Sequence, residues 1–133
     1  MPISIQWYDD SKRVVLCDFD GAWTLEQLHA IYTESHNMCM TVPENKVIAL
    51  LDLTHSASVI PPNIFSALST RRRTQAPNFD MIVVVSSSRL IKVFVNIMMT
   101  MPALHDQFAL YDTYEDALAF IHQRQSAHER PVS

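Results

Sequence analysis

Apolar residues recur at every second position at the start of the chain, in the series Ile3, Ile5 and Trp7. This period of two predicts a half-buried β-strand. A second strand is expected over residues 14–19, after a short polar turn. The turn is too short for a helical crossover, so the first two strands should form an antiparallel hairpin.

Four later segments combine apolar residues at helical spacing with a suitable starting residue. Thr24 and Gln27 form the capping-box pattern, in which a hydroxyl accepts from a free first-turn amide. Pro62 suits the first position of a helix, and Ser88 and Thr113 are placed to cap two more. The expected helices therefore cover residues 25–41, 62–73, 89–101 and 114–124.

Two short and almost continuously apolar runs, residues 47–53 and 81–85, have the pattern of parallel strands covered on both faces. A last short strand is expected over residues 108–111. Strands that alternate with helices imply right-handed crossovers, so we expect an α/β fold with five strands in a mainly parallel sheet and four helices, in the order β-β-α-β-α-β-α-β-α. Residues 1–124 should form one domain, followed by a loosely ordered tail over 125–133.

Composition narrows the classes of partner. The chain has 133 residues and a formal net charge of −4, which argues against nucleic acid because phosphates require a basic surface. No apolar stretch approaches the length of a membrane span, and no secretory leader is apparent.

Cys17 and Cys39 lack metal or redox spacing, which suits the cytoplasm. Gly21 is the only glycine, so phosphate-cradling loops are absent and no cofactor is expected.

Several motifs follow these elements in order: FDGAWTLEQL after the second strand, VIALLDLT, the serine-rich end of MIVVVSSS, and the closing YDTYEDALAFI. With the order of elements, they resemble the STAS superfamily and, more narrowly, its SpoIIAA-like branch. This resemblance implies a partner-switching domain whose second helix begins near a serine phosphorylated by a kinase. Here Pro61 and Pro62 occupy that neighbourhood, and Ser58 is the nearest hydroxyl. The usual phosphoserine is therefore not expected.

Polar residues follow three of the parallel strands, at the sheet edge where α/β proteins bind ligands. They offer a site for a small polar or anionic ligand or for a partner. The alternative is that these side chains only cap helices and turns. The candidate binding residues at this edge are Asp52, Thr54, His55, Ser58, Ser86, Ser87 and Arg89, with Asp112 and Thr113 after the last strand.

The third expected helix is apolar around most of its circumference, which requires cover on more than one side. Phe94, Met98 and Met101 are its candidate contact residues, because methionine adapts to irregular surfaces. Three alternatives remain open: a subunit interface, the wall of an apolar pocket, or a helix buried between its neighbours.

No catalytic or metal-binding constellation is recognisable. Glu26 and His29 form half of a di-metal pattern with no second copy, and His36 and Cys39 lack a third group to orient them. We therefore expect a non-enzymatic interaction or regulatory domain that forms a homodimer. It should use the second and third helices and the adjoining loops to contact a protein partner. The alternative is a carrier or sensor of a small apolar or amphipathic ligand held near the third helix.

Overall fold

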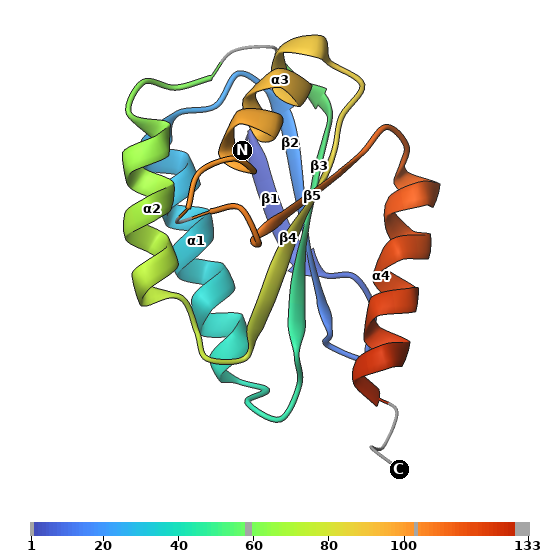
Figure 1. Ribbon diagram of the computed structural model, residues 1–133. Coiled ribbons are helices and arrows are strands. Elements are labelled where there is room, and N and C mark those ends of the chain that lie inside the picture. Colours follow the sequence, from blue (N-terminus) through green and yellow to red (C-terminus); the bar gives the residue numbers. More distant parts are fainter. Residues whose placement is uncertain (1, 58–59, 103, 130–133) are drawn as a thin grey trace.

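The computed structural model describes residues 2–57, 60–102 and 104–129, and contains one five-stranded sheet with four helices (Figure 1). The strand order is β1-β2-β3-β4-β5, with β1 antiparallel to β2 and every other neighbouring pair parallel. This confirms the expected α/β fold and its leading hairpin. The strands are β1 (Ile3–Trp7), β2 (Val14–Gly21), β3 (Val47–Ser56), β4 (Phe79–Val85) and β5 (Phe108–Tyr111), and the helices are α1 (Leu25–Met40), α2 (Ile64–Thr74), α3 (Arg89–Met98) and α4 (Tyr114–Glu129).

The helices cover the sheet unequally. Helices α1, α2 and α3 lie on one face and α4 lies on the other (Figure 1). Because side chains of a strand alternate between faces, β3 contributes to two separate apolar clusters. Val47 and Ala49 belong to the cluster under the three helices, while Ile48 and Leu50 belong to the cluster under α4. The central strands are thus covered on both faces, as their continuous apolar runs predict.

Helix α1 begins as its capping box predicts. The Gln27 amide donates to Thr24 Oγ1 over 3.1 Å, and the Thr24 amide donates to Gln27 Oε1 over 2.9 Å. The two bonds satisfy backbone donors that the helix itself cannot reach. The helix ends at Met40, with Thr41 as its C-cap.

The expected start of the second helix at Pro62 is wrong. Helix α2 begins at Ile64, and its N-cap Asn63 adopts the left-handed conformation, with φ 63° and ψ 16°. A left-handed residue breaks the helical path, so Pro62 stands outside the helix instead of occupying its first turn. Asparagine tolerates this conformation better than most residues, because its short polar side chain can bond locally.

The third helix is shorter than predicted. Helix α3 ends at Met98, and the amides of Thr100 and Met101 then donate to Ile97 and Met98 in tight turns. The Thr100 hydroxyl also donates to the Ile97 carbonyl over 2.6 Å, which occupies an acceptor that a continuing helix would use. Met101 therefore lies after the helix and not on it.

The last helix continues past the boundary expected at residue 124. Helix α4 runs to Glu129, and Gln125 Nε2 donates to the Arg13 carbonyl over 3.0 Å. This bond ties the last turns of α4 to the start of β2. Residues 130–133 lie outside the described part of the chain.

Candidate functional site

The carboxyl ends of the parallel strands meet at one edge of the sheet. The register places Asp18, Asp52, Val85 and Tyr111 in a single row across β2, β3, β4 and β5. Strands β4 and β5 end in this row, whereas β3 continues past the end predicted at residue 53 and pairs with β2 as far as Ser56. The β1–β2 turn that contains Asp9 lies at the opposite end of the sheet, because β2 runs parallel to β3 from Val14 onward.

Three residues in the carboxyl-terminal half of β3, and not after the strand as the sequence predicted, form a chain of hydrogen bonds. Asp52 Oδ1 accepts from the Thr54 hydroxyl over 2.6 Å and from the Thr54 amide over 3.0 Å. Thr54 Oγ1 also lies 3.2 Å from His55 Nδ1. A carboxylate only accepts, so the single hydroxyl proton goes to Asp52 and His55 Nδ1 must be the donor to Thr54. In this arrangement His55 cannot act as a base on the threonine hydroxyl, and the cluster lies in β3 where its pairing with β2 shifts register.

The serines after β4 organise the start of α3. Ser86 is buried, and its hydroxyl accepts from the Ser88 amide over 3.1 Å. Ser88 Oγ in turn accepts from the Ile91 amide over 3.4 Å as the N-cap. The side chains of Ser87 and Arg89 are exposed beside this cap.

After β5, Asp112 pairs with Lys92, and Thr113 Oγ1 accepts from the Asp116 amide over 3.2 Å. The candidate Ser58 lies outside the described residues.

A surface hollow that the sequence did not reveal lies on the α4 side of the same edge. Its volume is about 320 Å³. Burial, and then the charges of Tyr8, Asp52 and Asp18, raise the pKa of the Tyr114 phenol there. The sequence did not predict Asp18 as a site residue, because its position in the alternating pattern is that of an ordinary solvent-facing strand residue. The lining residues are Ser4, Gln6, Leu16, Asp18, Asp52 and Tyr114.

The predicted contact residues of the third helix do not form its outer surface. Met98 is 2% exposed and belongs to the core. Phe94 is half-buried with its ring centroid 4.8 Å from that of Phe65 on α2, and Met101 packs against the same core. What α3 exposes is a different set, Leu90 at 45%, Val93 at 51% and Ile97 at 48%. The sequence showed a surplus of apolar residues, but not which stripe is turned outward.

An apolar cavity of about 50 Å³ lies between α3, the neighbouring helices and the sheet. Phe94 and Met98 contribute to its lining, with Ile91 and Val95 from the same helix. Pockets that hold drug-sized ligands have volumes of about 300–1,000 Å³. In this conformation the cavity is therefore too small for the apolar ligand considered from the sequence.

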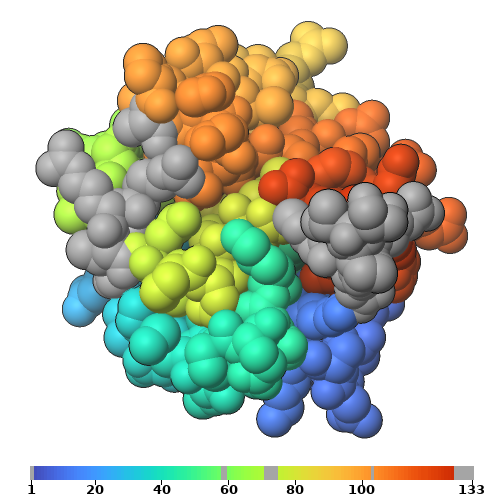
Figure 2. Space-filling view, turned by 60° about the horizontal axis from the view of Figure 1, so that its bottom comes forward, coloured from blue at the N-terminus to red at the C-terminus, as the bar shows by residue number. Residues whose placement is uncertain are grey.

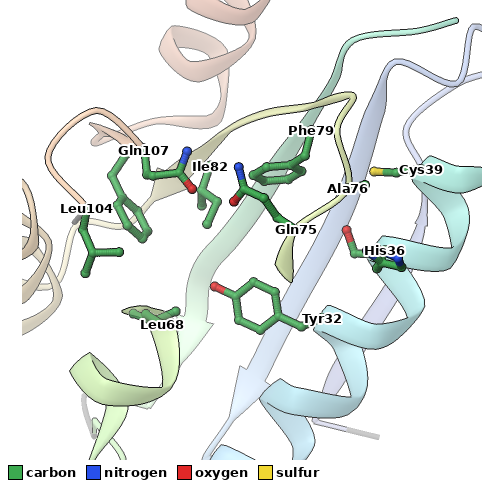
Figure 3. Close-up of a pocket in the computed structure, with 12 residues that line it drawn as sticks. Tyr32, His36, Cys39, Leu68, Gln75, Ala76, Phe79, Ile82, Leu104 and Gln107 are labelled. Carbon is green, nitrogen blue, oxygen red and sulfur yellow. The ribbon is translucent and has the colours of Figure 1, made fainter. Parts of the chain in front are cut away.

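A second, more polar pocket opens at the amino end of the sheet. Figure 2 looks onto this end, where the segment around residues 75–80 lies between the end of α1 and the segment before β5. Asn78 Nδ2 secures this corner by donating to the carbonyls of Cys39 and Val42. The pocket has a volume of about 40 Å³ and is drawn in Figure 3. It is lined by Tyr32, Ser35, His36, Cys39, Leu68, Gln75, Ala76, Phe79, Ile82, Leu104, Gln107 and Phe108.

The two cysteines form no disulfide, and their thiols are expected to be poor nucleophiles. Burial raises the pKa of the Cys17 thiol to about 12 and that of the Cys39 thiol to about 11. Both thiols are therefore protonated at neutral pH, whereas a nucleophilic cysteine needs a lowered pKa. Cys39 thus contributes to the amino-end pocket as a small apolar group.

Two further properties concern metals and membranes. Among the residues that the structure describes, no three His, Cys, Asp or Glu side chains gather in a way that would hold a metal ion. Within the same ranges, none of the helices combines the length and the apolar content that a bilayer span requires.

No protein-family model matches the chain, and no curated protein matches it by sequence. Solved structures do match it, and two of them cover most of its length. A protein of the DUF3478 family with a SpoIIAA-like fold, from Shewanella loihica PV-4, has a TM-score of 0.59 and 14% identity over 89% of this chain and 90% of its own. An anti-sigma factor antagonist from Mycobacterium paratuberculosis has a TM-score of 0.59 and 16% identity over 90% of this chain and 94% of its own. At these identities the likeness concerns architecture: the chain has the SpoIIAA-like fold that its resemblance to the STAS superfamily implied.

Proposed function

We propose that this protein is a non-enzymatic, cytoplasmic interaction domain that associates with a second copy of itself through α3. The observation that carries the proposal is the distribution of exposed apolar side chains. Of the five large hydrophobic residues that are exposed in the described part of the chain, four lie on α3 or at its C-cap. They are Leu90, Val93, Ile97 and Met99. Exposed apolar residues scattered singly are normal, but a continuous set on one helix marks an interaction surface.

The spacing of this set suits helix packing. Leu90, Val93 and Ile97 are separated by three and four positions, so they form one stripe along the helix. A second stripe, of Ile91, Val95 and Met98, is buried against the core. Helix α3 therefore presents apolar side chains in two directions, and only one of them is covered within a single chain.

A second copy is the occupant that the charges favour. The exposed stripe is uncharged, and the only charged residues of α3 are Arg89 and Lys92, since the helix contains no acidic residue. Lys92 is already paired with Asp112. In an antiparallel α3–α3 pair the exposed Arg89 would approach the carbonyl end of the partner's α3, where a cation is favourable. Such a twofold interface uses the same apolar stripe on both copies.

The fold supports a binding role. One protein with a similar structure is named an anti-sigma factor antagonist, and we extend from it only the expectation that this chain acts by contacting a protein. The proposal includes no phosphorylation switch, because Pro61 and Pro62 precede α2. The cytoplasm suits the two buried and unpaired thiols of Cys17 and Cys39.

The proposal is tested by sedimentation velocity over a concentration series from about 1 to 100 μM. We expect the wild-type protein to sediment as a concentration-dependent dimer. Val93→Glu places a charge in the middle of the stripe and should weaken association at least tenfold, because the buried carboxylate would lack a partner. Gln123→Glu adds the same charge on the exposed side of α4 and should leave association unchanged. A monomeric wild-type protein at 100 μM would exclude self-association, and a partner of another kind would then have to cover α3.

A further inference from the structure

The amino-end pocket contains two buried polar side chains that the fold itself does not satisfy. Gln107 is 4% exposed and Ser35 is 8% exposed, and both line this pocket. Within the part of the chain that the structure describes, neither side chain has a hydrogen bond. Buried amides and hydroxyls are almost always hydrogen-bonded, because leaving them unpaired is costly. This pair therefore calls for a functional explanation.

The unpaired groups open onto the pocket. No fully inaccessible side-chain nitrogen or oxygen lacks a hydrogen bond among the described residues. The unpaired polar atoms of Ser35 and Gln107 are therefore accessible to solvent, and both residues line the pocket. Figure 3 shows the amide of Gln107 directed toward that of Gln75, from opposite sides of the pocket. Three polar groups from α1, the end of α2 and the start of β5 thus converge on one small volume.

The hydrogen-bonding chemistry of these three polar side chains favours a neutral ligand. Each glutamine amide offers both a donor and an acceptor, and so does the serine hydroxyl. None of the other described lining residues is an Asp, Glu, Lys or Arg, and His36 is the one imidazole among them. A carboxylate or ammonium group would lose its hydration here without a reliable opposite charge. A neutral ligand group that carries both a hydrogen-bond donor and an acceptor could pair with the acceptor of one pocket side chain and the donor of another.

The size and shape of the pocket restrict the class of ligand further. The volume of about 40 Å³ admits a group of only a few heavy atoms, because a cavity needs about 10–15 Å³ to hold even one water. A carboxamide has three such atoms: carbon, oxygen and nitrogen. Phe79 and Tyr32 provide flat ring surfaces beside it, and Leu68 and Leu104 line an apolar side (Figure 3). We propose that the amino-end pocket binds the carboxamide group of a small neutral ligand through Gln107, Gln75 and Ser35.

The residues of this pocket differ from those of the exposed α3 stripe. A failure of the self-association proposal would therefore leave the ligand-binding proposal unaffected, and the reverse also holds. The test is a ¹H–¹⁵N NMR titration with propionamide, in which the side-chain NH₂ signals of Gln75 and Gln107 report binding directly. We expect these signals to shift and saturate at millimolar concentrations. Propionate has nearly the same shape and should bind at least tenfold more weakly, because it carries a charge and no N–H donor.

Variants connect the binding to the named groups. Gln107→Leu keeps the approximate size of the side chain and should weaken propionamide binding at least tenfold, while thermal unfolding shows that the variant folds. Ser35→Ala is the milder second variant and should weaken binding about threefold. Gln123→Leu makes the same change on the exposed side of α4 and should have no effect. The proposal is overturned if propionamide leaves the glutamine signals unmoved, if propionate binds equally well, or if Gln107→Leu and Ser35→Ala bind like the wild type.

Discussion

Arg124 of α4 forms a bidentate ion pair with Asp80 of β4. Arg124 Nε donates to Asp80 Oδ2 over 2.7 Å, and Nη2 donates to Asp80 Oδ1 over 2.8 Å. The Asp80 side chain is 5% exposed and that of Arg124 is 37% exposed. The hydrogen bond to Asp80 raises the pKa of the guanidinium. The pair therefore fixes the last helix to the strand on the otherwise less covered face of the sheet.

Arg124→Leu should lower the free energy of unfolding by about 2 kcal/mol, because it leaves the carboxylate of Asp80 buried without this partner. Arg124→Lys retains the charge but loses the paired geometry, so it should lie between the wild type and the leucine variant. Urea denaturation monitored by circular dichroism measures both changes. If Arg124→Leu were as stable as the wild type, the ion pair would contribute nothing to holding α4.

Alkaline pH should destabilise the protein partly through Cys39. Burial raises the pKa of its thiol to about 11 in the folded protein, from 9.0 for an ordinary cysteine thiol. Between these values the unfolded chain loses its proton first, so the free energy of unfolding falls as the pH rises, by at most about 1.4 kcal/mol per pH unit.

Cys39→Ala removes this contribution, so its loss of stability between about pH 9 and 10.5 should be shallower than that of the wild type. Urea denaturation at several pH values measures the two slopes. Cys17 is present in both proteins and acts as an internal control. Parallel slopes would mean that the Cys39 thiol does not titrate with a raised pKa.

The left-handed N-cap of α2 makes position 63 sensitive to branching at Cβ. Asn63→Val should lower the free energy of unfolding by about 1–2 kcal/mol, because a β-branched residue is strained at φ 63°. Asn63→Gly should be tolerated or slightly stabilising. Asn37→Val on the exposed side of α1 measures the ordinary helical cost of valine. Equal losses at positions 37 and 63 would show that the left-handed cap is not maintained in solution.

The sequence predicted the fold well, because the signals for its elements are local. Apolar runs identified β3 and β4, and the Thr24–Gln27 pair identified the start of α1. The start of α2 was missed because the pattern gave Pro62 the role of a first helical residue, whereas the backbone conformation of Asn63 decides the boundary. That conformation depends on how the preceding loop joins the sheet, which no local pattern encodes.

The candidate sites were less predictable, because they depend on which side of an element faces outward. The surplus of apolar residues in α3 was visible, but the exposure of Val93 and the burial of Met98 follow from the way the helix packs. The amino-end pocket was not predicted at all. Ser35 and Gln107 are 72 positions apart, and neither belongs to a recognisable motif, so only the fold brings them together.

The most direct test of the central claim is disulfide formation by Val93→Cys. In an antiparallel α3–α3 pair, residue 93 lies near the twofold axis, so the two introduced thiols should meet, while Cys17 and Cys39 stay buried and unreactive. Under mild oxidation we expect Val93→Cys to form a covalent dimer on non-reducing electrophoresis, and Ser126→Cys on the exposed side of α4 to remain monomeric. A monomeric Val93→Cys protein, or equal dimer yields from both variants, would contradict association through α3.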